Sequence, residues 1–198
     1  PFQLDRHLLF KDKEYTPVSG TNYYTVTAMQ HVSNALLGKS DEIIDIHNHD
    51  DFFQILLLMS QQSRRNILIF SHSLDHRIYD NEDMYTALKE LAIASRHTYI
   101  KILLQDAKPM TTRGHRLLEL SRHLSSHVAI RLAAKEHKDI LKTFILVDDC
   151  GFIIHDNPHR YDARCSFNAP LHARDLKEKF TDMWERGFED NSLRRLGL

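Results

Sequence analysis

The sequence is poor in the residues that define several specialised classes of protein. It contains only two cysteines, Cys150 and Cys165, so it supports neither a disulfide framework nor a Cys-x-x-Cys zinc motif. Its longest apolar run, ILLLM at 55–59, is far shorter than the roughly 20 residues of a membrane-spanning helix. The net charge of −1 offers no general attraction for nucleic acid. We therefore expect a cytoplasmic protein without a membrane partner, in which any binding patch is local.

What the sequence does contain is a regular alternation of two patterns. Short apolar runs typical of strands are followed by longer segments with helical spacing, which favours an α/β fold with parallel strands joined by crossovers. We expect residues 1–40 to form an N-terminal arm with a helix at 24–37, and residues 41–198 to form the α/β domain. The predicted strands lie at 42–47, 66–71, 98–106 and 127–132, and the predicted helices at 50–65, 81–97, 113–124 and 171–188.

The last strands differ from the rest, because TFILVDDCGFIIHD, which begins at Thr143, predicts two strands around a tight turn at Asp148 and Asp149. The predicted fold class is α/β, with a mixed, mainly parallel sheet and helices on both faces.

The stretch EIIDIHNHDDF raises the question of a metal site, because two imidazoles two residues apart at a strand end can share one ion. Hydrolases that begin in this way need a larger scaffold, and a barrel commonly takes about 250 residues. We favour a structural interpretation, in which His47 ends a strand while Asn48 and Asp50 cap the following helix. On this basis we expect neither a metal nor another cofactor.

Five segments carry a resemblance to a known family. From about residue 43 to 188 the chain resembles one half of the phospholipase D-like fold. It is most similar to an uncharacterised, largely proteobacterial family of single phospholipase D-like domains, some of them fused to acetyltransferase domains. The matching segments are NILIFSHSLDHRIYDN (66–81), KILLQDAKP (101–109), RGHRLLELSRHLSSHVAIR (113–131), FILVDDCG (144–151) and FTDMWERG (180–187).

The resemblance implies a phosphodiesterase motif that is degenerate here. Active members use His-x-Lys followed by Asp, in which the histidine attacks phosphorus and the lysine neutralises phosphate oxygens. Aligning the aspartate on Asp148 places Leu141 at the histidine position and Thr143 at the lysine position. Aligning it on Asp149 gives Lys142 and Phe144, so neither alignment restores the motif. We therefore do not expect the phosphodiesterase activity of the active members. Because active relatives build their site from two halves and this chain resembles one half, the resemblance also implies a symmetric homodimer.

The densest basic cluster lies in the predicted helix 113–124, after the strand that ends near Asp106. Arg113 and Arg116 would share one face of this helix, and a helix that follows a parallel strand is a common place for an anion. The alternative is an amphipathic helix with its leucines buried and its arginines solvated.

A second polar segment, LDHRIYDN, follows the strand 66–71. Its Asp75, Arg77, Tyr79 and Asp80 would lie at the same edge of the sheet, whereas the alternative is a turn in which Asp80 or Asn81 caps the next helix. The candidate ligand-binding residues of both segments are Arg77, Tyr79, Arg113, His115, Arg116 and Arg122.

These features favour a non-catalytic module that binds a phosphate-bearing partner, nucleic acid being the commonest such polymer. A hydrolase with a rebuilt site is an alternative, in which His72, Asp75, His115 and His155 would be the acid, base or metal ligands. A subunit that serves only protein interaction is a third.

Overall fold

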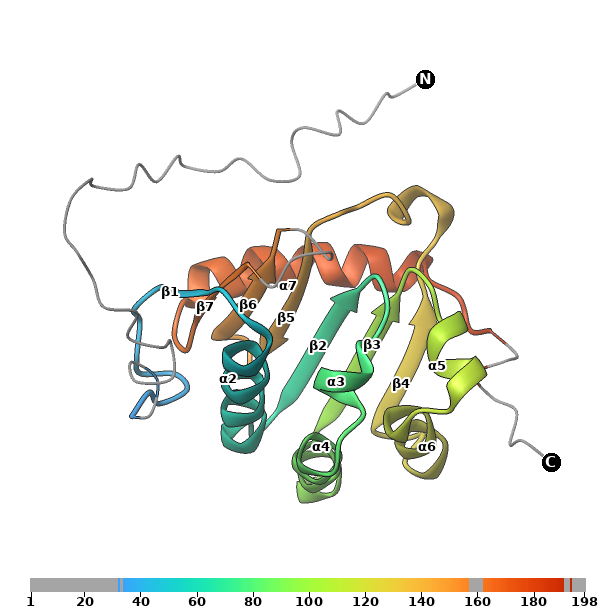
Figure 1. Ribbon diagram of the computed structural model, residues 1–198, viewed down its shortest axis with the longest axis horizontal. Coiled ribbons are helices and arrows are strands. Elements are labelled where there is room, and N and C mark those ends of the chain that lie inside the picture. The colour runs from blue at the N-terminus through green and yellow to red at the C-terminus, as the bar shows by residue number, and fades with distance from the viewer. Residues whose placement is uncertain (1–31, 33, 157–161, 191–192, 194–198) are drawn as a thin grey trace.

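The computed structural model describes residue 32, residues 34–156 and 162–190, and residue 193. These residues form one seven-stranded sheet with the strand order β1-β7-β6-β5-β2-β3-β4 (Figure 1). The expected helix at 24–37 lies mostly outside the described residues. The strands are β1 (Ile44–Ile46), β2 (Asn66–Ser71), β3 (Tyr99–Leu104), β4 (Val128–Leu132), β5 (Thr143–Val147), β6 (Gly151–His155) and β7 (Ala163–Ser166).

The sheet is mixed, as predicted, but it is not mainly parallel. Strand β2 pairs with β3 and β3 with β4 in parallel, whereas the other four pairings are antiparallel. A parallel strand needs a crossover of a dozen or more residues, usually a helix. Residues 133–142, which join β4 to β5, hold only a short 3-10 turn, Lys135–His137. Strand β5 therefore returns antiparallel to β2, and two further antiparallel strands follow it.

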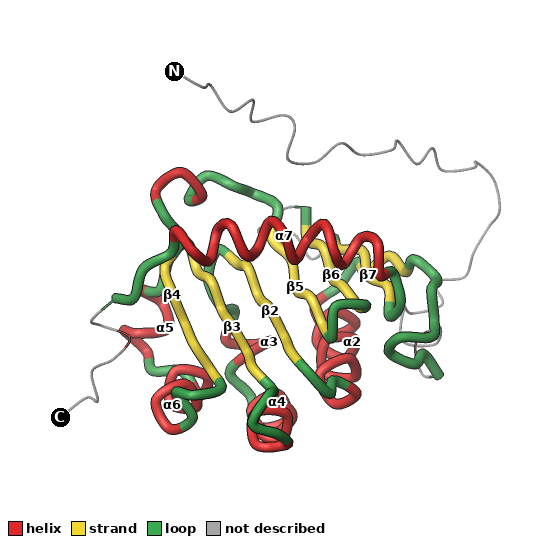
Figure 2. Tube along the Cα trace, turned by 180° about the vertical axis from the view of Figure 1, so that it is seen from behind, coloured by secondary structure: helices red, strands yellow, loops and turns green. Residues whose placement is uncertain are grey.

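Helices cover both faces of the sheet, as expected (Figures 1 and 2). One face packs against the helices that connect the parallel strands, and the long C-terminal helix crosses the other. Each face has its own apolar core. No helix within the described ranges combines the length and apolar character needed to cross a membrane. The helices are α2 (His49–Gln62), α3 (His76–Tyr79), α4 (Glu82–Ala94), α5 (Lys108–Arg113), α6 (Arg116–His123) and α7 (Pro170–Arg186).

The start of α2 confirms the predicted cap by Asn48 but not the one by Asp50. The side chain of Asn48 caps the helix by accepting a hydrogen bond from the backbone N–H of Asp51, whereas Asp50 lies in the first turn. His47 follows the end of β1 and lies 3.5 Å from a carboxylate oxygen of Asp162.

The predicted helix 113–124 is broken. Gly114 has a φ of 77°, a left-handed conformation that glycine tolerates and a helix cannot continue. It separates α5 from α6, and His115 then caps α6 by accepting a hydrogen bond from the backbone N–H of Leu117 at 3.1 Å. Arg113 therefore ends one helix and Arg116 begins the next, so the prediction that they share a helix face is wrong.

The predicted turn between β5 and β6 is confirmed, and Asp148 fixes it to the start of β2. Asp148 and Asp149 both have positive φ values, 52° and 60°, as in a tight hairpin turn. The buried carboxylate of Asp148 accepts a hydrogen bond from the Ser63 hydroxyl at 2.8 Å. It also accepts bonds from the backbone N–H groups of residues 64–66 at 2.7–3.0 Å. One side chain thus satisfies the backbone where β2 begins.

Replacing Asp148 with Ala should lower the free energy of unfolding by about 3 kcal/mol, because several buried donors lose a charged acceptor. Asp148→Asn should cost less, since asparagine tolerates positive φ and keeps one acceptor oxygen. Urea denaturation followed by circular dichroism measures both. A loss below about 0.5 kcal/mol for Asp148→Ala, the range of an ordinary surface substitution, would contradict this role.

Candidate functional site

The site lies at the edge of the sheet where the parallel strands end. Because β5 runs against β2, its first residues lie beside the end of β2, with Phe144 opposite Phe70. Strand β6 ends at the same edge, with His155 opposite Thr143. Residues from distant parts of the sequence therefore meet where α/β proteins commonly bind ligands.

A cavity of about 260 Å³ opens at this edge. Its floor is apolar and aromatic, and its polar groups are hydroxyls, imidazoles and one carboxylate. Helices α2 and α3 close one side, and the ends of β2, β5 and β6 form the other. The lining residues are Phe52, Phe70, Ser71, His72, Ser73, Asp75, Ile78, Tyr79, Thr143, Phe144, Ile145, Ile153 and His155.

A hydrogen-bond chain holds His72 in this wall. The side-chain N–H₂ of Gln105 donates to the backbone carbonyls of His137 and Ile140, at 2.7 and 2.8 Å. Its oxygen therefore accepts from Nδ1 of His72, at 3.1 Å. Because Nδ1 then carries the ring proton, Nε2 of neutral His72 is left as an acceptor.

Burial keeps two other polar groups of the cavity uncharged. Burial, with the nearby carboxylate of Asp75, raises the pKa of Tyr79 well above its ordinary value, so the phenol stays protonated. Burial also lowers the pKa of His155, while Asp156 and Asp162 act in the opposite direction. At neutral pH, the His155 ring is therefore mainly the uncharged imidazole.

The structure brings the two predicted polar segments together. The backbone N–H of Arg116 donates to Asp80 at 2.8 Å, which links the end of α3 to the start of α6. The guanidinium of Arg116 lies 3.7 Å from Asp80 and 3.4 Å from Glu82. Arg77 forms an ion pair with Asp75 at 3.2 Å, and its side chain is 65% exposed.

The remaining candidates differ in exposure and in place. Arg113 is exposed at the end of α5, whereas Tyr79 and His115 are buried. Arg122 lies away from the contact between Asp80 and Arg116, beside the edge strand β4. Its Nε donates a hydrogen bond to the carbonyl of Leu193 at 3.1 Å. Binding by any of these residues stays a prediction.

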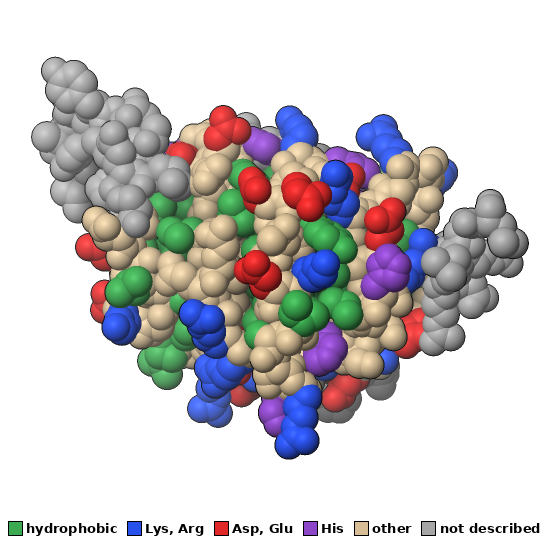
Figure 3. All heavy atoms as spheres, turned by 90° about the horizontal axis from the view of Figure 1, so that it is seen from below, with side chains coloured by type: hydrophobic (Ala, Val, Ile, Leu, Met, Phe, Trp, Pro, Cys, Tyr) green, Lys and Arg blue, Asp and Glu red, His purple; other side chains and the backbone are tan. Residues whose placement is uncertain are grey.

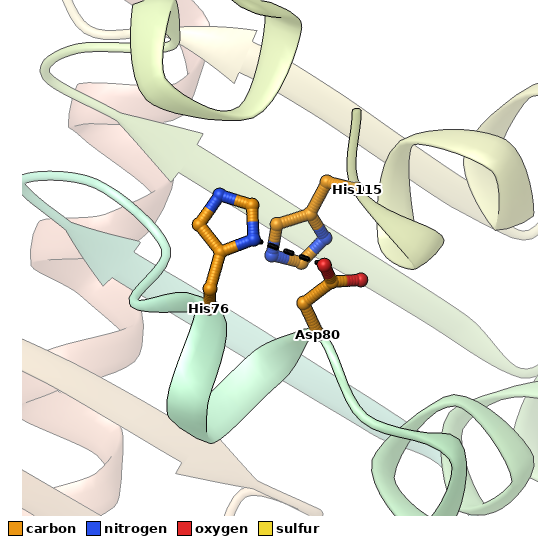
Figure 4. Close-up of side chains that lie close together, drawn as sticks. All are labelled: His76, Asp80 and His115. Atoms are coloured by element: carbon orange, nitrogen blue, oxygen red, sulfur yellow. Dashed lines mark hydrogen bonds and ion pairs between the residues drawn. The ribbon is translucent and has the colours of Figure 1, made fainter. Parts of the chain in front are cut away.

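His76, Asp80 and His115 form a cluster that the sequence interpretation missed in part (Figure 4). Nδ1 of His76 lies 2.9 Å from Oδ2 of Asp80, and the two imidazole centroids are 5.1 Å apart. Burial lowers the pKa of His115 to about 4, so the ring is neutral. Burial of Asp80 acts to raise its pKa, but hydrogen bonds from Arg116 and His76 outweigh it and hold that pKa below its ordinary value.

The cavity also contains the residue at the lysine position of the phosphodiesterase motif in each of the two alignments, Thr143 and Phe144. Thr143 lies in its wall, while Leu141 precedes β5 and is 63% exposed. Of the four residues considered for a rebuilt site, His72, Asp75 and His155 line this cavity. His115 belongs to the cluster with His76 and Asp80 instead.

The fold is that of a phospholipase D-like α/β domain. Nuc from Salmonella typhimurium, a phospholipase D family member, matches with a TM-score of 0.52 over 74% of this chain and 95% of its own, at 15% identity. NucT from Helicobacter pylori matches with a TM-score of 0.54 over 75% of this chain and 100% of its own, at 14% identity.

A third similar structure is TrmBL2, an archaeal chromatin protein, with a TM-score of 0.58 and 14% identity. The match covers 82% of this chain, which spans 58% of TrmBL2. At these identities the likeness is one of fold. The chain belongs to the family described as a domain of unknown function, DUF7931, whose model matches residues 48–196. A search of curated proteins gave no match.

Asp80→Ala should lower the free energy of unfolding by about 2 kcal/mol, because the partly buried carboxylate accepts hydrogen bonds that join α3 to α6. The measurement is made in EDTA, so that no metal ion contributes to stability. Asp75→Ala is the matched control. It removes the N-cap of α3 and a more exposed ion pair, and should cost only about 1 kcal/mol. Chemical denaturation compares them, and equal losses would show that Asp80 does not join the two helices.

Proposed function

We propose that this protein binds a phosphate-bearing partner, a nucleic acid, without cleaving it. The observation that carries the proposal is the position of Thr143 in the cavity wall. The phospholipase D motif, aligned on Asp148, would put its lysine there. A threonine hydroxyl can donate a hydrogen bond to a phosphate oxygen, but it cannot neutralise the charge that develops during phosphoryl transfer.

The charge of the cavity supports binding without cleavage. None of its lining residues, all of them in the described part of the chain, is a lysine or an arginine, and Asp75 is an acid. Phosphoryl transfer depends on cations or metal ions that stabilise the phosphate oxygens. The aligned histidine position is occupied by Leu141, whose side chain cannot act as a nucleophile.

Cations outside the cavity provide the proposed contacts. Arg77 and Arg113 are both exposed on segments joined by the contact between Asp80 and Arg116. We assign the direct phosphate contacts to Arg77 and Arg113. Arg116 contributes less, because two carboxylates lie beside its guanidinium and its side chain is 45% exposed, whereas that of Arg77, which pairs with Asp75, is 65% exposed. The buried Tyr79 and His115 shape the surface, and Arg122 would contact a longer polymer.

A nucleic acid is the phosphate polymer that the comparisons favour. TrmBL2 is described as a chromatin protein with a novel mode of DNA binding, and its fold is similar to that of this chain. The net charge of this chain is only −1, so a few local arginines are sufficient to attract a polyanion.

A symmetric homodimer belongs to the same proposal, since the domain resembles one half of the two-part sites of active relatives. Multi-angle light scattering at micromolar concentration should give about twice the 23.2 kDa of one chain. A mass of one chain would contradict the dimer without affecting phosphate binding.

Replacing both Arg77 and Arg113 with Ala should weaken the binding of labelled DNA and RNA and flatten the dependence of log affinity on log salt. The magnitude of the slope should fall by about two, because each phosphate contact that forms releases about one counterion and the variant forms two fewer contacts. Fluorescence anisotropy between about 50 and 200 mM salt measures this slope. Over this range a protein with many phosphate contacts loses about 10³-fold or more in affinity.

The control removes the same charge from a part of the surface that carries no proposed contact. Lys89 lies within α4 and Arg96 follows the end of this helix, and both are exposed. On the face seen from below, acidic and basic side chains are intermixed (Figure 3). The Lys89→Ala, Arg96→Ala variant should bind as the parent does. Equal binding by all three proteins would refute the assignment of Arg77 and Arg113.

A hydrolase with a rebuilt site is a second candidate, because His72, Asp75 and His155 line one cavity. If it were correct, the purified protein would turn over a generic phosphodiester such as bis(p-nitrophenyl) phosphate. His72→Ala and His155→Ala would then abolish turnover while leaving nucleic-acid affinity unchanged. We expect no turnover by the parent, with or without added divalent metal.

A further inference from the structure

We propose that His76, Asp80 and His115 bind a divalent metal ion of the zinc type. Each residue offers one ligand atom, and these three atoms lie within 4.8 Å of one another. His76 begins α3, Asp80 follows its end, and His115 precedes α6. Figure 4 shows the His115 ring directed toward the space between the other two side chains.

Unused hydrogen-bonding capacity points to a ligand in this space. The side chain of His115 is buried, with 3% of the residue exposed, and its Nδ1 is used by the backbone N–H of Leu117. The other ring nitrogen, Nε2, has no hydrogen-bond partner. Buried polar atoms without a partner are rare in proteins and call for an explanation such as an ion.

Asp80 divides its two oxygens between the helices and the proposed ion. Oδ1 accepts the backbone N–H of Arg116 at 2.8 Å, whereas Oδ2 lies 2.9 Å from Nδ1 of His76. The metal would take Oδ2, Nδ1 of His76 and Nε2 of His115. Asp80 could therefore bind the ion without giving up its link to α6.

The donor set selects the class of metal. Two imidazole nitrogens and one carboxylate oxygen suit Zn²⁺ and its neighbours Co²⁺ and Ni²⁺ better than Mg²⁺ or Ca²⁺, which prefer oxygen ligands. Tetrahedral bonds of about 2.1 Å put ligand atoms about 3.4 Å apart. The His76 and Asp80 atoms, 2.9 Å apart, must therefore separate slightly, and the His115 nitrogen, within 4.8 Å of both, closes the remaining gap by a shift of roughly an ångström. The His76 and Asp80 side chains are 27% and 20% exposed, which lets water complete the coordination.

Metal binding would change the tautomer of His115. In the metal-free protein, Nδ1 accepts the Leu117 N–H, so the ring proton lies on Nε2. A metal at Nε2 takes the place of that proton, and Nδ1 gains a proton from solvent, so the ring stays neutral. The helix cap is then lost. The bond between Nδ1 of His76 and Oδ2 of Asp80 is lost as well, and the proton of this Nδ1 is replaced by one that Nε2 of the same ring takes from solvent. Two hydrogen bonds are thus given up while three metal bonds form.

The test uses the full chain, freed of metal with EDTA and then dialysed. We expect isothermal titration to show tight Zn²⁺ binding and a rise in melting temperature. His115→Asn removes Nε2 but supplies another good helix cap, so its melting temperature in EDTA should change little. Loss of a residue that only orients a metal ligand commonly lowers metal affinity by about 10–100-fold. Because His115→Asn removes a ligand itself, its zinc affinity should fall by more than this.

His123→Asn, at the exposed end of α6, is the control and should bind Zn²⁺ as the parent does. The proposal is wrong if His115→Asn binds Zn²⁺ as tightly as the parent. Ring ¹⁵N spectra of the parent supply a test that does not depend on how a variant folds. Zinc should move the His115 proton from Nε2 to Nδ1, and an unchanged His115 signal would overturn the site.

Discussion

The architecture depends on the antiparallel pairing of β5 with β2. This pairing joins the parallel strands β2–β4 to the antiparallel strands that follow, and it places Phe144 beside Phe70. The cavity results from it, because the start of β5 and the end of β6 then lie where β2 ends. Asp148 holds the other end of the pairing through its hydrogen bonds to Ser63 and residues 64–66. A structural carboxylate at one edge thus positions the candidate site at the other.

Much of the fold was predictable because its strands are short apolar runs between helical segments. The hairpin of β5 and β6 was predicted, but the antiparallel direction of β5 against β2 was not, since an apolar run such as TFILV shows the same pattern in a parallel and an antiparallel strand. The missing helix between β4 and β5 was the available signal. The break at Gly114 was also missed, because Leu117, Leu118 and Leu120 continue a helical pattern that outweighs one glycine. A glycine followed by a residue able to cap a helix is the clue that could have placed the boundary.

The candidate site was predictable only in part. Side chains after two parallel strands were expected to meet, and Asp80 and Arg116 do meet. Their ion pairing depends on the contact between the end of α3 and the start of α6, which no local pattern encodes. The spacing of His76 and Asp80, four residues apart, was readable from the sequence, but His115 reaches them only through the fold. The likeness to Nuc, NucT and TrmBL2 supports the phospholipase D-like architecture, while the chemistry must be judged from the residues in place.

The central claim is that this domain holds a phosphate polymer and leaves it intact. The most direct measurement follows one end-labelled oligonucleotide in two ways after prolonged incubation with excess protein and divalent metal. A native gel reports whether it is bound, and a denaturing gel of the same sample reports its length. The account predicts a retarded complex on the native gel that dissociates at high salt, and a strand of unchanged length on the denaturing gel. Shortened strands that disappear with His72→Ala or His155→Ala, or the absence of any complex at low salt, would contradict it.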